Sequence, residues 1–230
     1  MIPTKISRSY HLRYLSHSYP LRVASLFAVV IAIAGCESGI IPSSAPTLES
    51  SYYINPAKSL ASLGNVALIE LHNQSTYPQI SAEMTDALYQ AIQKKHIFGL
   101  TVIRSNDPTW KNLPINPEST YTLDQLLATR KVVASDAILV GAITGYQPYP
   151  HMSIGLRLKL IDLNDGQLLW AIEQVWDTAD KNTEKRIKTY FEHELRAAFA
   201  PLRQDLAVLS SINFVKFVAF EVAETLQTRQ

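Results

Sequence analysis

The feature that most constrains this fold is a strictly alternating stretch, SIGLRLKLID, at residues 153–162. Its apolar side chains recur at every second position with Arg157 and Lys159 between them, which predicts a strand with one dry face. Asn-Asp-Gly follows at 164–166, and Asp-Gly tolerates the positive φ that a tight hairpin needs. Because QLLWAIEQVW then returns, residues 153–176 are predicted to form an antiparallel hairpin. The side chains expected inside it are Ile154, Leu156, Leu158, Leu160 and Trp170.

The remainder of the chain predicts strands and helices in mixed order. NVALIEL at 65–71 and AILVGAITGY at 137–146 are apolar runs of strand length, and we expect the second to be covered on both faces. Helical spacing of apolar residues begins at Pro78 and again after Thr122, which is a good helix cap. The order strand, helix, strand, helix, three strands, then helices predicts one α+β domain at 64–230, a mixed sheet packed by helices.

Three further segments complete this prediction. LTVIR at 100–104 indicates a strand after Gly99, which we expect to end the preceding helix. Residues 105–120 contain three prolines and are typical of a long loop. The tail predicts two helices that Pro201 separates. The last one carries a row of phenylalanines beside its main apolar stripe, so it is either fully buried or partly docked on a partner: Phe214, Phe217 and Phe220.

The N-terminal segment has the composition of a secretory signal. No acidic residue precedes Glu37, and an uncharged apolar run occupies residues 23–35. That run is shorter than the roughly 20 residues that a membrane-spanning helix needs. A basic start, an apolar middle and a small-residue end together predict a signal peptide at 1–35. The basic residues of the start are Lys5, Arg8, Arg13 and Arg22.

The only cysteine of the chain, Cys36, follows directly after Ile33-Ala34-Gly35. This sequence resembles a bacterial lipobox, and the resemblance implies signal cleavage between Gly35 and Cys36 and a lipid on the cysteine. Two or more acyl chains anchor a protein stably, at about 0.8 kcal/mol per buried CH₂. The alternatives are an uncleaved signal anchor and a buried core cysteine. Glu37 stands where an Asp would favour inner-membrane retention, so we expect an outer-membrane anchor with the domain in the periplasm.

Residues 36–63 follow as a predicted flexible tether. ESGIIPSSAPTLESS is rich in serine and proline and has no usable period, and YYINPAKS continues it, with contact to the domain as an open alternative. Loss of the signal would leave 17 basic residues against 20 acidic ones, a net charge of −3. A nucleic-acid partner would leave a basic footprint, so none is expected.

Residues 135–171 carry a recognisable series of features. They comprise Asp136, Val140-Gly141, Tyr146, the alternating leucines, Ile161-Asp162, Asp165-Gly166 and Leu169-Trp170.

This pattern resembles a superfamily of bacterial envelope lipoproteins, which includes the curli-secretion channel lipoprotein and the lipoprotein activators of penicillin-binding proteins. The resemblance covers residues 65–178. It implies a fold like that of anticodon-binding or TolB N-terminal domains, and a periplasmic domain that binds another envelope component. The curli channel inserts a membrane-crossing hairpin after its glycine-containing strand. Here only residues 147–152 occupy that place, and two spanning strands need about 9–11 residues each, so we expect no pore.

No motif of a known catalytic class is present in the sequence. The four histidines after Cys36 include no pair at metal-ligand spacing, and neither H-E-x-x-H nor G-x-S-x-G occurs. We therefore expect a non-enzymatic protein without metal or cofactor. Two alternatives stay open: a subunit of an oligomeric envelope secretion assembly, and a hydrolase whose site assembles only in space. The histidines are His72, His96, His151 and His193.

Aromatic residues supply the candidate partner contact. Tyr146, Pro148, Tyr149 and Pro150 lie in or beside the predicted connection between two strands. A solvent-facing aromatic cluster in a loop is typical of a contact surface, but proline also stiffens turns, so a purely structural role is equally open. For the tryptophans at 170 and 176, core packing is the first interpretation.

Overall fold

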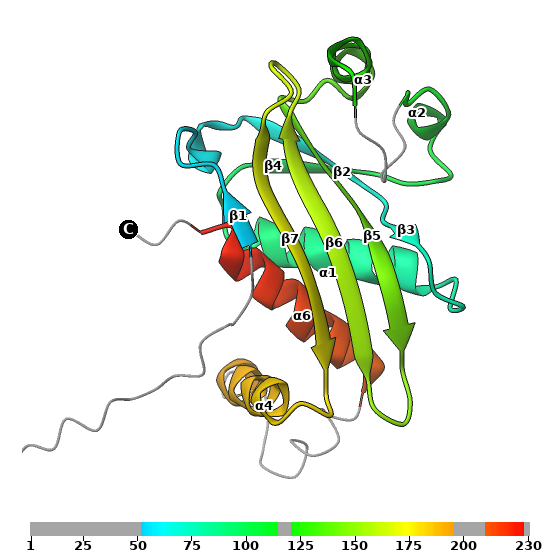
Figure 1. Cartoon of the computed structure of the whole chain (residues 1–230), viewed down its shortest axis with the longest axis vertical. Helices are drawn as coiled ribbons and strands as arrows, with labels where there is room; N and C mark the ends of the chain where they lie inside the picture. The colour runs from blue at the N-terminus through cyan, green and yellow to red at the C-terminus, as the bar shows by residue number, and fades with distance from the viewer. Residues whose placement is uncertain (1–51, 115–120, 196–209, 228–230) are drawn as a thin grey trace, which may run out of the picture. The chain divides into compact units, whose positions relative to one another are not determined.

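The computed structural model describes residues 52–114, 121–195 and 210–227. A seven-stranded sheet runs in the order β1-β7-β6-β5-β2-β4, with β3 paired to β5 beside that path (Figure 1). The strands are β1 (Tyr52–Ile54), β2 (Asn65–Ile69), β3 (His72–Asn73), β4 (Gly99–Ile103), β5 (Ala137–Gln147), β6 (Ser153–Asp162) and β7 (Leu168–Asp177). The helices are η2 (Leu60–Ser62, 3₁₀), α1 (Ile80–Gln93), α2 (Pro108–Lys111), α3 (Leu123–Val133), α4 (Lys181–Leu195) and α6 (Ser211–Thr225).

The sheet is mixed, as predicted. β2 pairs in parallel with both β4 and β5, whereas β5, β6, β7 and β1 pair antiparallel. The hairpin of β6 and β7 is confirmed, with Leu158 opposite Ile172 and Gly166 at a φ of 74° in its turn. Gly141 of β5 lies opposite Leu158, and a Cβ there would come within 2.2 Å of the Arg157 carbonyl oxygen. Only glycine therefore fits at this position in the pairing of β5 with β6.

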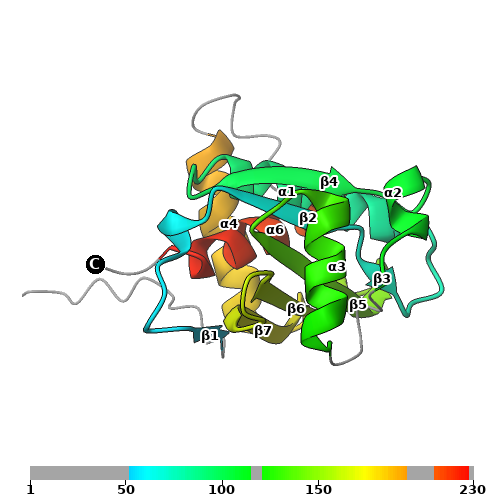
Figure 2. The same ribbon diagram turned by 90° about the horizontal axis from the view of Figure 1, so that it is seen from above.

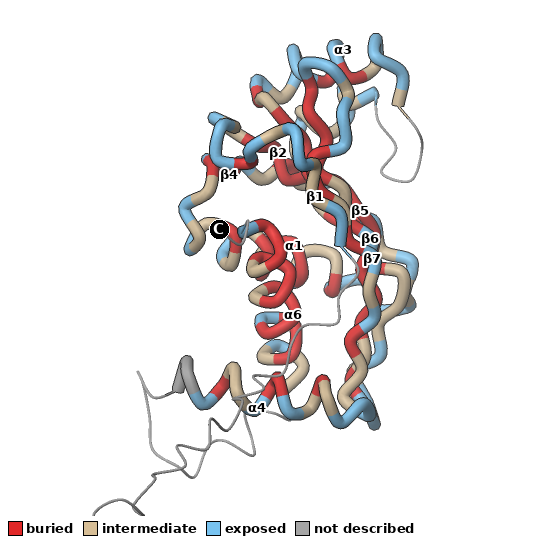
Figure 3. The backbone as a smooth tube through the Cα atoms, turned by 60° about the vertical axis from the view of Figure 1, so that its left-hand side comes forward, coloured by how far each residue is buried: buried red, intermediate tan, exposed pale blue. Residues whose placement is uncertain are grey.

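Helices α1 and α6 cover one face of the sheet (Figures 1 and 3). The alternating positions of β6 point into this layer, and none of them is exposed to solvent. Trp170 and Trp176 of β7 are fully buried beside them, which confirms the core-packing interpretation. Phe214 and Phe217 of α6 are buried too, whereas Phe220 is partly exposed. The residues of β6 in this core are Ile154, Leu156, Leu158 and Leu160.

The opposite face of the sheet is covered only in part. Helix α3 packs over one end of it through Leu126, as Figure 2 shows. Along the rest of β6 and β7, Arg157, Glu173 and Val175 face solvent. The smaller core beneath α3 consists of Ala67, Ile69, Ile103, Leu126, Ile138, Val140, Ile161 and Leu163.

The sheet begins earlier than the sequence predicts. β1 lies inside the range 36–63 that the sequence assigns to the tether, and it pairs with β7 through Tyr52 opposite Ile172. Leu60 is only 2% exposed, and the Lys58 ammonium donates to Asp162 at 2.6 Å and to Asp165 at 2.5 Å. For residues 52–63 the tether prediction is therefore wrong. Individual contacts with distant residues hold this segment against the domain. Such contacts produce no periodic pattern in the sequence.

Two further predictions are corrected in detail. α1 ends at Gln93, and Gly99 instead begins β4. The predicted loop at 105–120 contains α2, because the Asp107 carboxylate accepts the Thr109 backbone N–H at 2.7 Å and caps a helix that begins with proline.

Helix α3 begins where the sequence predicts. Thr122 and Gln125 form a reciprocal capping box at its N-terminus. However, Leu123 and Leu127 are exposed to 52% and 38%, because only one side of this helix meets the sheet. Gly35, Cys36 and Pro201 lie outside the described residues, as do residues 1–51 and 196–209. The expectations that concern them remain predictions.

Candidate functional site

The predicted contact loop connects β5 to β6 at one end of the sheet (Figure 1). Tyr149 is 81% exposed, the highest value among the large apolar side chains that are described. The Gln147 side chain donates to the Tyr149 carbonyl at 3.1 Å. Met152 exchanges two hydrogen bonds with Thr178, both of 2.9 Å. The loop therefore presents an aromatic side chain on a backbone that is held at both of its ends.

Tyr146 has a different environment from Tyr149. It is half-buried, its ring meets the Tyr77 ring edge-on at a centroid distance of 5.4 Å, and its hydroxyl is hydrogen-bonded to Ser211. Burial raises the pKa of Tyr146, so its hydroxyl stays protonated at neutral pH. Of the predicted contact residues, Tyr146 is therefore half-buried and packs against its neighbours. Tyr149 and Pro150 are exposed, and Pro148 is partly exposed.

Two residues that the sequence does not mark as contact residues lie next to Tyr146 or to its partner Ser211. Tyr77 is 41% exposed and contacts Tyr146, and Ile212 is 57% exposed at the start of α6, next to Ser211. Helical spacing in the sequence places Ile212 in the main apolar stripe of the last helix, where burial is expected, and no pattern marks Tyr77. We call Tyr77, Tyr146, Tyr149, Pro150 and Ile212 the loop-end surface.

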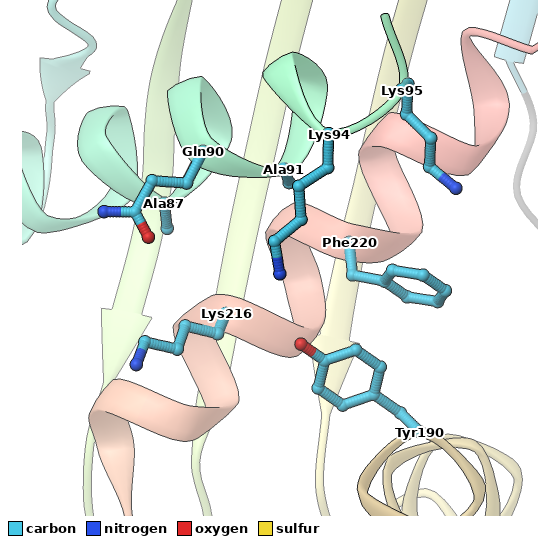
Figure 4. A pocket seen from close by; sticks show the side chains of 8 residues that line it. All are labelled: Ala87, Gln90, Ala91, Lys94, Lys95, Tyr190, Lys216 and Phe220. Atoms are coloured by element: carbon cyan, nitrogen blue, oxygen red, sulfur yellow. The ribbon is translucent and has the colours of Figure 1, made fainter. Parts of the chain in front are cut away.

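A second candidate is a groove between α1, α4 and α6, on the far side of these helices from the sheet (Figure 4). Its volume is about 340 Å³. Figure 4 shows Lys94 extending from α1 toward α6, and the hydroxyl of Tyr190 extending from α4 into the same space. The groove is lined by Ala87, Gln90, Ala91, Lys94, Lys95, Tyr190, Lys216 and Phe220.

Aromatic rings form one wall of this groove. The rings of Tyr190 and Phe220 are 4.8 Å apart at their centroids. The Lys95 ammonium lies 5.2 Å from the centre of the Phe220 ring, a cation–π contact, and it also pairs with Glu224 at the rim. The groove therefore combines positive charge with an aromatic surface.

Beneath the helices lies a buried ion pair that is closed to solvent. Arg186 of α4 donates through Nε to Glu221 of α6 at 2.8 Å, and Trp176 of β7 donates through Nε1 to the same carboxylate at 2.6 Å. Burial raises the pKa of Glu221, although Arg186 and Trp176 oppose that shift. Because all three side chains are buried, this cluster joins three elements and offers no group to a substrate.

The described residues include no group of three or more His, Cys, Asp or Glu side chains that is placed to hold a metal ion. His72, His96 and His151 are all exposed. Among these same residues, no helix combines the length and apolar character that a membrane span requires. The prediction of a lipid on Cys36 is not tested, since that residue is outside the described ranges.

No protein-family model and no curated protein sequence matches this chain. Among solved structures, it is similar to the PelC dodecamer from Paraburkholderia phytofirmans, with a TM-score of 0.49 and 13% identity over 79% of this chain and 98% of that one. It is also similar to the LpoB C-terminal domain from Salmonella enterica, with a TM-score of 0.36 and 17% identity over 49% and 82%.

A third similar structure is the lipoprotein GNA1162 from Neisseria meningitidis, with a TM-score of 0.40 and 12% identity over 59% of this chain and 99% of that one. Each of these TM-scores is below 0.5 and each identity is below 25%. The likenesses therefore carry no conclusion about what this chain does.

Proposed function

We propose that this chain is a non-enzymatic lipoprotein, anchored to the outer membrane through Cys36, whose periplasmic α+β domain binds another component of the cell envelope. The observation that carries the proposal is Tyr149, 81% exposed on a braced loop. We propose the loop-end surface as the contact.

The physical chemistry of this surface favours protein binding. Tyrosine is enriched at interfaces because it brings a large contact area with few rotatable bonds. Ordering a mobile loop costs free energy on binding, and a loop already held by Gln147 and Thr178 avoids part of that cost. Tyr77, which contacts Tyr146, and Ile212, which follows Ser211, are exposed apolar side chains next to these supporting residues. The alternative, a purely stiffening role, applies better to Tyr146, which is turned inward.

Site-specific photocrosslinking tests the contact. We would place a photoreactive phenylalanine analogue at position 149, and as a control at position 132, where Val132 is 37% exposed on α3. Irradiation of intact cells should give a discrete adduct from position 149 and none from position 132. Ile212→Ser should weaken that adduct, because it removes apolar area from the same surface. Equal adducts from both positions would contradict the proposal.

The mass of the adduct decides between the proposal and its rival. An adduct of this chain with a different envelope protein supports the binding module. An adduct of twice the mass of the chain would support the oligomeric secretion assembly instead, because position 149 would then meet a second copy.

The anchor is tested separately. Cys36→Ser should abolish incorporation of labelled palmitate and stop protein of mature size from accumulating in the membrane fraction, since no other residue resembles a lipidation site. Equal labelling of the wild type and the variant would show that the lipobox prediction is wrong.

A further inference from the structure

We propose that the groove between α1, α4 and α6 binds an anionic ligand through a phosphate group, carried either by a small soluble molecule or by a lipid headgroup. The proposal is independent of the loop-end surface, which lies at the end of the strands. It rests on the charges, the walls and the size of the groove (Figure 4).

Positive charge gathers here on a chain that is otherwise slightly acidic. Lys94, Lys95 and Lys216 all line the groove, whereas the chain after residue 35 carries a net charge of −3. Lys95 pairs with Glu224. Neither Lys94 nor Lys216 forms an ion pair with any residue that the structure describes. Two ammonium groups are therefore available to an incoming anion.

Helix electrostatics explains these lysines only in part. Lys94 and Lys95 follow directly after α1, where a cation interacts favourably with the helix dipole. Lys216, however, lies in the second turn of α6, in the N-terminal half of that helix and away from its C-terminal end. The dipole gives no reason for a cation there, whereas an anion bound by Lys94 and Lys216 would account for both of these lysines.

The donors suit a phosphate. Each ammonium is a compact charge with three donors on a flexible stem, which suits an anion with acceptor oxygens in several directions. A lone carboxylate is better matched by the flat fork of arginine, and no arginine lines this groove. The volume of about 340 Å³ is within the range of small-ligand sites. The rings of Tyr190 and Phe220 can cover an apolar part attached to the phosphate.

The first experiment measures binding of inorganic pyrophosphate to the full chain in neutral detergent by isothermal titration calorimetry. The wild type should bind saturably. Lys94→Gln/Lys216→Gln should weaken binding at least about fivefold, because two charge-assisted contacts are lost. The matched control, Lys111→Gln/Lys131→Gln, removes the same charge from exposed positions on α2 and α3. It should stay within about twofold of wild type. Equal weakening by both double variants would overturn the proposal, and so would the absence of saturable binding if the lipid measurement below also fails.

A conservative variant guards against a folding defect. Lys94→Arg/Lys216→Arg keeps the charge, so it should bind pyrophosphate more tightly than the glutamine variant, because arginine also pairs with phosphate. If the arginine variant is folded by circular dichroism and has lost binding as fully as the glutamine variant, charge in the groove is not what binds the anion.

The second experiment separates the two sources of phosphate. The full chain is placed in neutral micelles that contain either phosphatidic acid or phosphatidylcholine, and the phosphorus resonance of each lipid is followed. A change for phosphatidic acid that Lys94→Gln/Lys216→Gln removes supports a headgroup ligand. Binding of pyrophosphate alone supports a soluble one. Failure of both ligands would refute the site without bearing on the loop-end surface.

Discussion

Two arginine–glutamate pairs lie on opposite faces of the β6–β7 hairpin, and their environments could hardly differ more. Arg157 and Glu173 are 2.6 Å apart on the open face, with side chains 47% and 65% exposed. Arg186 and Glu221 are 2.8 Å apart beneath the helices, with side chains 8% and 7% exposed. The shorter distance belongs to the pair that water screens. Distance alone therefore does not rank ion pairs, and burial decides how much depends on each.

The two carboxyl groups also shift in opposite directions. The guanidinium of Arg157 lowers the pKa of Glu173, which remains in water. Burial raises the pKa of Glu221, and its hydrogen bonds with Arg186 and Trp176 only oppose that rise. Burying the inner pair, Arg186 and Glu221, costs free energy, so its stability depends on every hydrogen-bond partner being present. The outer pair, Arg157 and Glu173, contributes little to the stability of the fold.

The largest expected effect comes from breaking the inner pair. Arg186→Met leaves a charged carboxylate buried without its partner, so it should lower the free energy of unfolding by about 3–5 kcal/mol. Urea denaturation measures this loss. The double variant Arg186→Met/Glu221→Leu removes both charges and should recover much of the stability. If Arg186→Met costs no more than Arg157→Met, the contrast between the two faces is wrong.

A second variant pair tests the same two faces through neighbouring positions of β6. Leu158 is fully buried, so Leu158→Ala should cost about 2–5 kcal/mol through lost burial and the cavity left behind. Lys159 is the next residue and faces the other way, so Lys159→Ala should stay within about 0.5 kcal/mol of wild type. Similar losses at both positions in chemical denaturation would contradict the alternation.

The pH dependence of stability sharpens the comparison. Because the pKa of Glu221 is raised from its ordinary 4.5, the folded chain holds a proton there that the unfolded chain has released only in the pH window between 4.5 and the raised pKa. The free energy of unfolding should therefore fall as the pH rises from about 4.5 through the raised pKa. Glu221→Gln should flatten this slope in denaturation curves taken across the window. A slope that persists unchanged in the variant would assign it to other groups.

The smallest effect is expected on the open face. The lowered pKa of Glu173 gives a stabilisation that is present above its ordinary value of 4.5 and is lost as the pH falls through the lowered pKa, the reverse of Glu221. Since this carboxylate is fully in solvent, Glu173→Gln should change the midpoint of urea denaturation less than any variant above. A loss comparable to that of Leu158→Ala would show that the open face is covered.

The sequence predicts well those elements whose side chains follow a regular pattern. The period of two in β6 located the hairpin and its buried face, and the Thr122 cap located the start of α3. Single contacts leave no such signal. Lys58 meets Asp162 and Asp165 across more than a hundred residues, so nothing near Lys58 distinguishes this lysine from a solvated one. The sequence does not reveal the buried pair of Arg186 and Glu221 for the same reason. Each of the two charges looks like one on the solvent-facing side of a helix.

The candidate sites show the same division. Tyr149 was predicted because an aromatic beside two prolines in a short connection stands out locally. Tyr77 and Ile212 come from distant segments: Tyr77 contacts Tyr146, and Ile212 follows Ser211, which interacts with Tyr146. The lysines of the groove belong to α1 and α6, more than a hundred residues apart, and each alone is an ordinary surface lysine. Sites that assemble from several elements need the fold before they become visible.

The attachment of β1 has a mechanical consequence. β1 is antiparallel to β7, with Tyr52 opposite Ile172 and Ile54 opposite Trp170, so the first residue of β1 points toward the end of the sheet that carries the loop-end surface. Hydrogen bonds between antiparallel strands lie across the strand axis. A force applied to Tyr52 along the strand axis would therefore load the hydrogen bonds of β1 together, in shear, instead of opening them one after another. Lys58, held by both Asp162 and Asp165, would be the next point to bear the load.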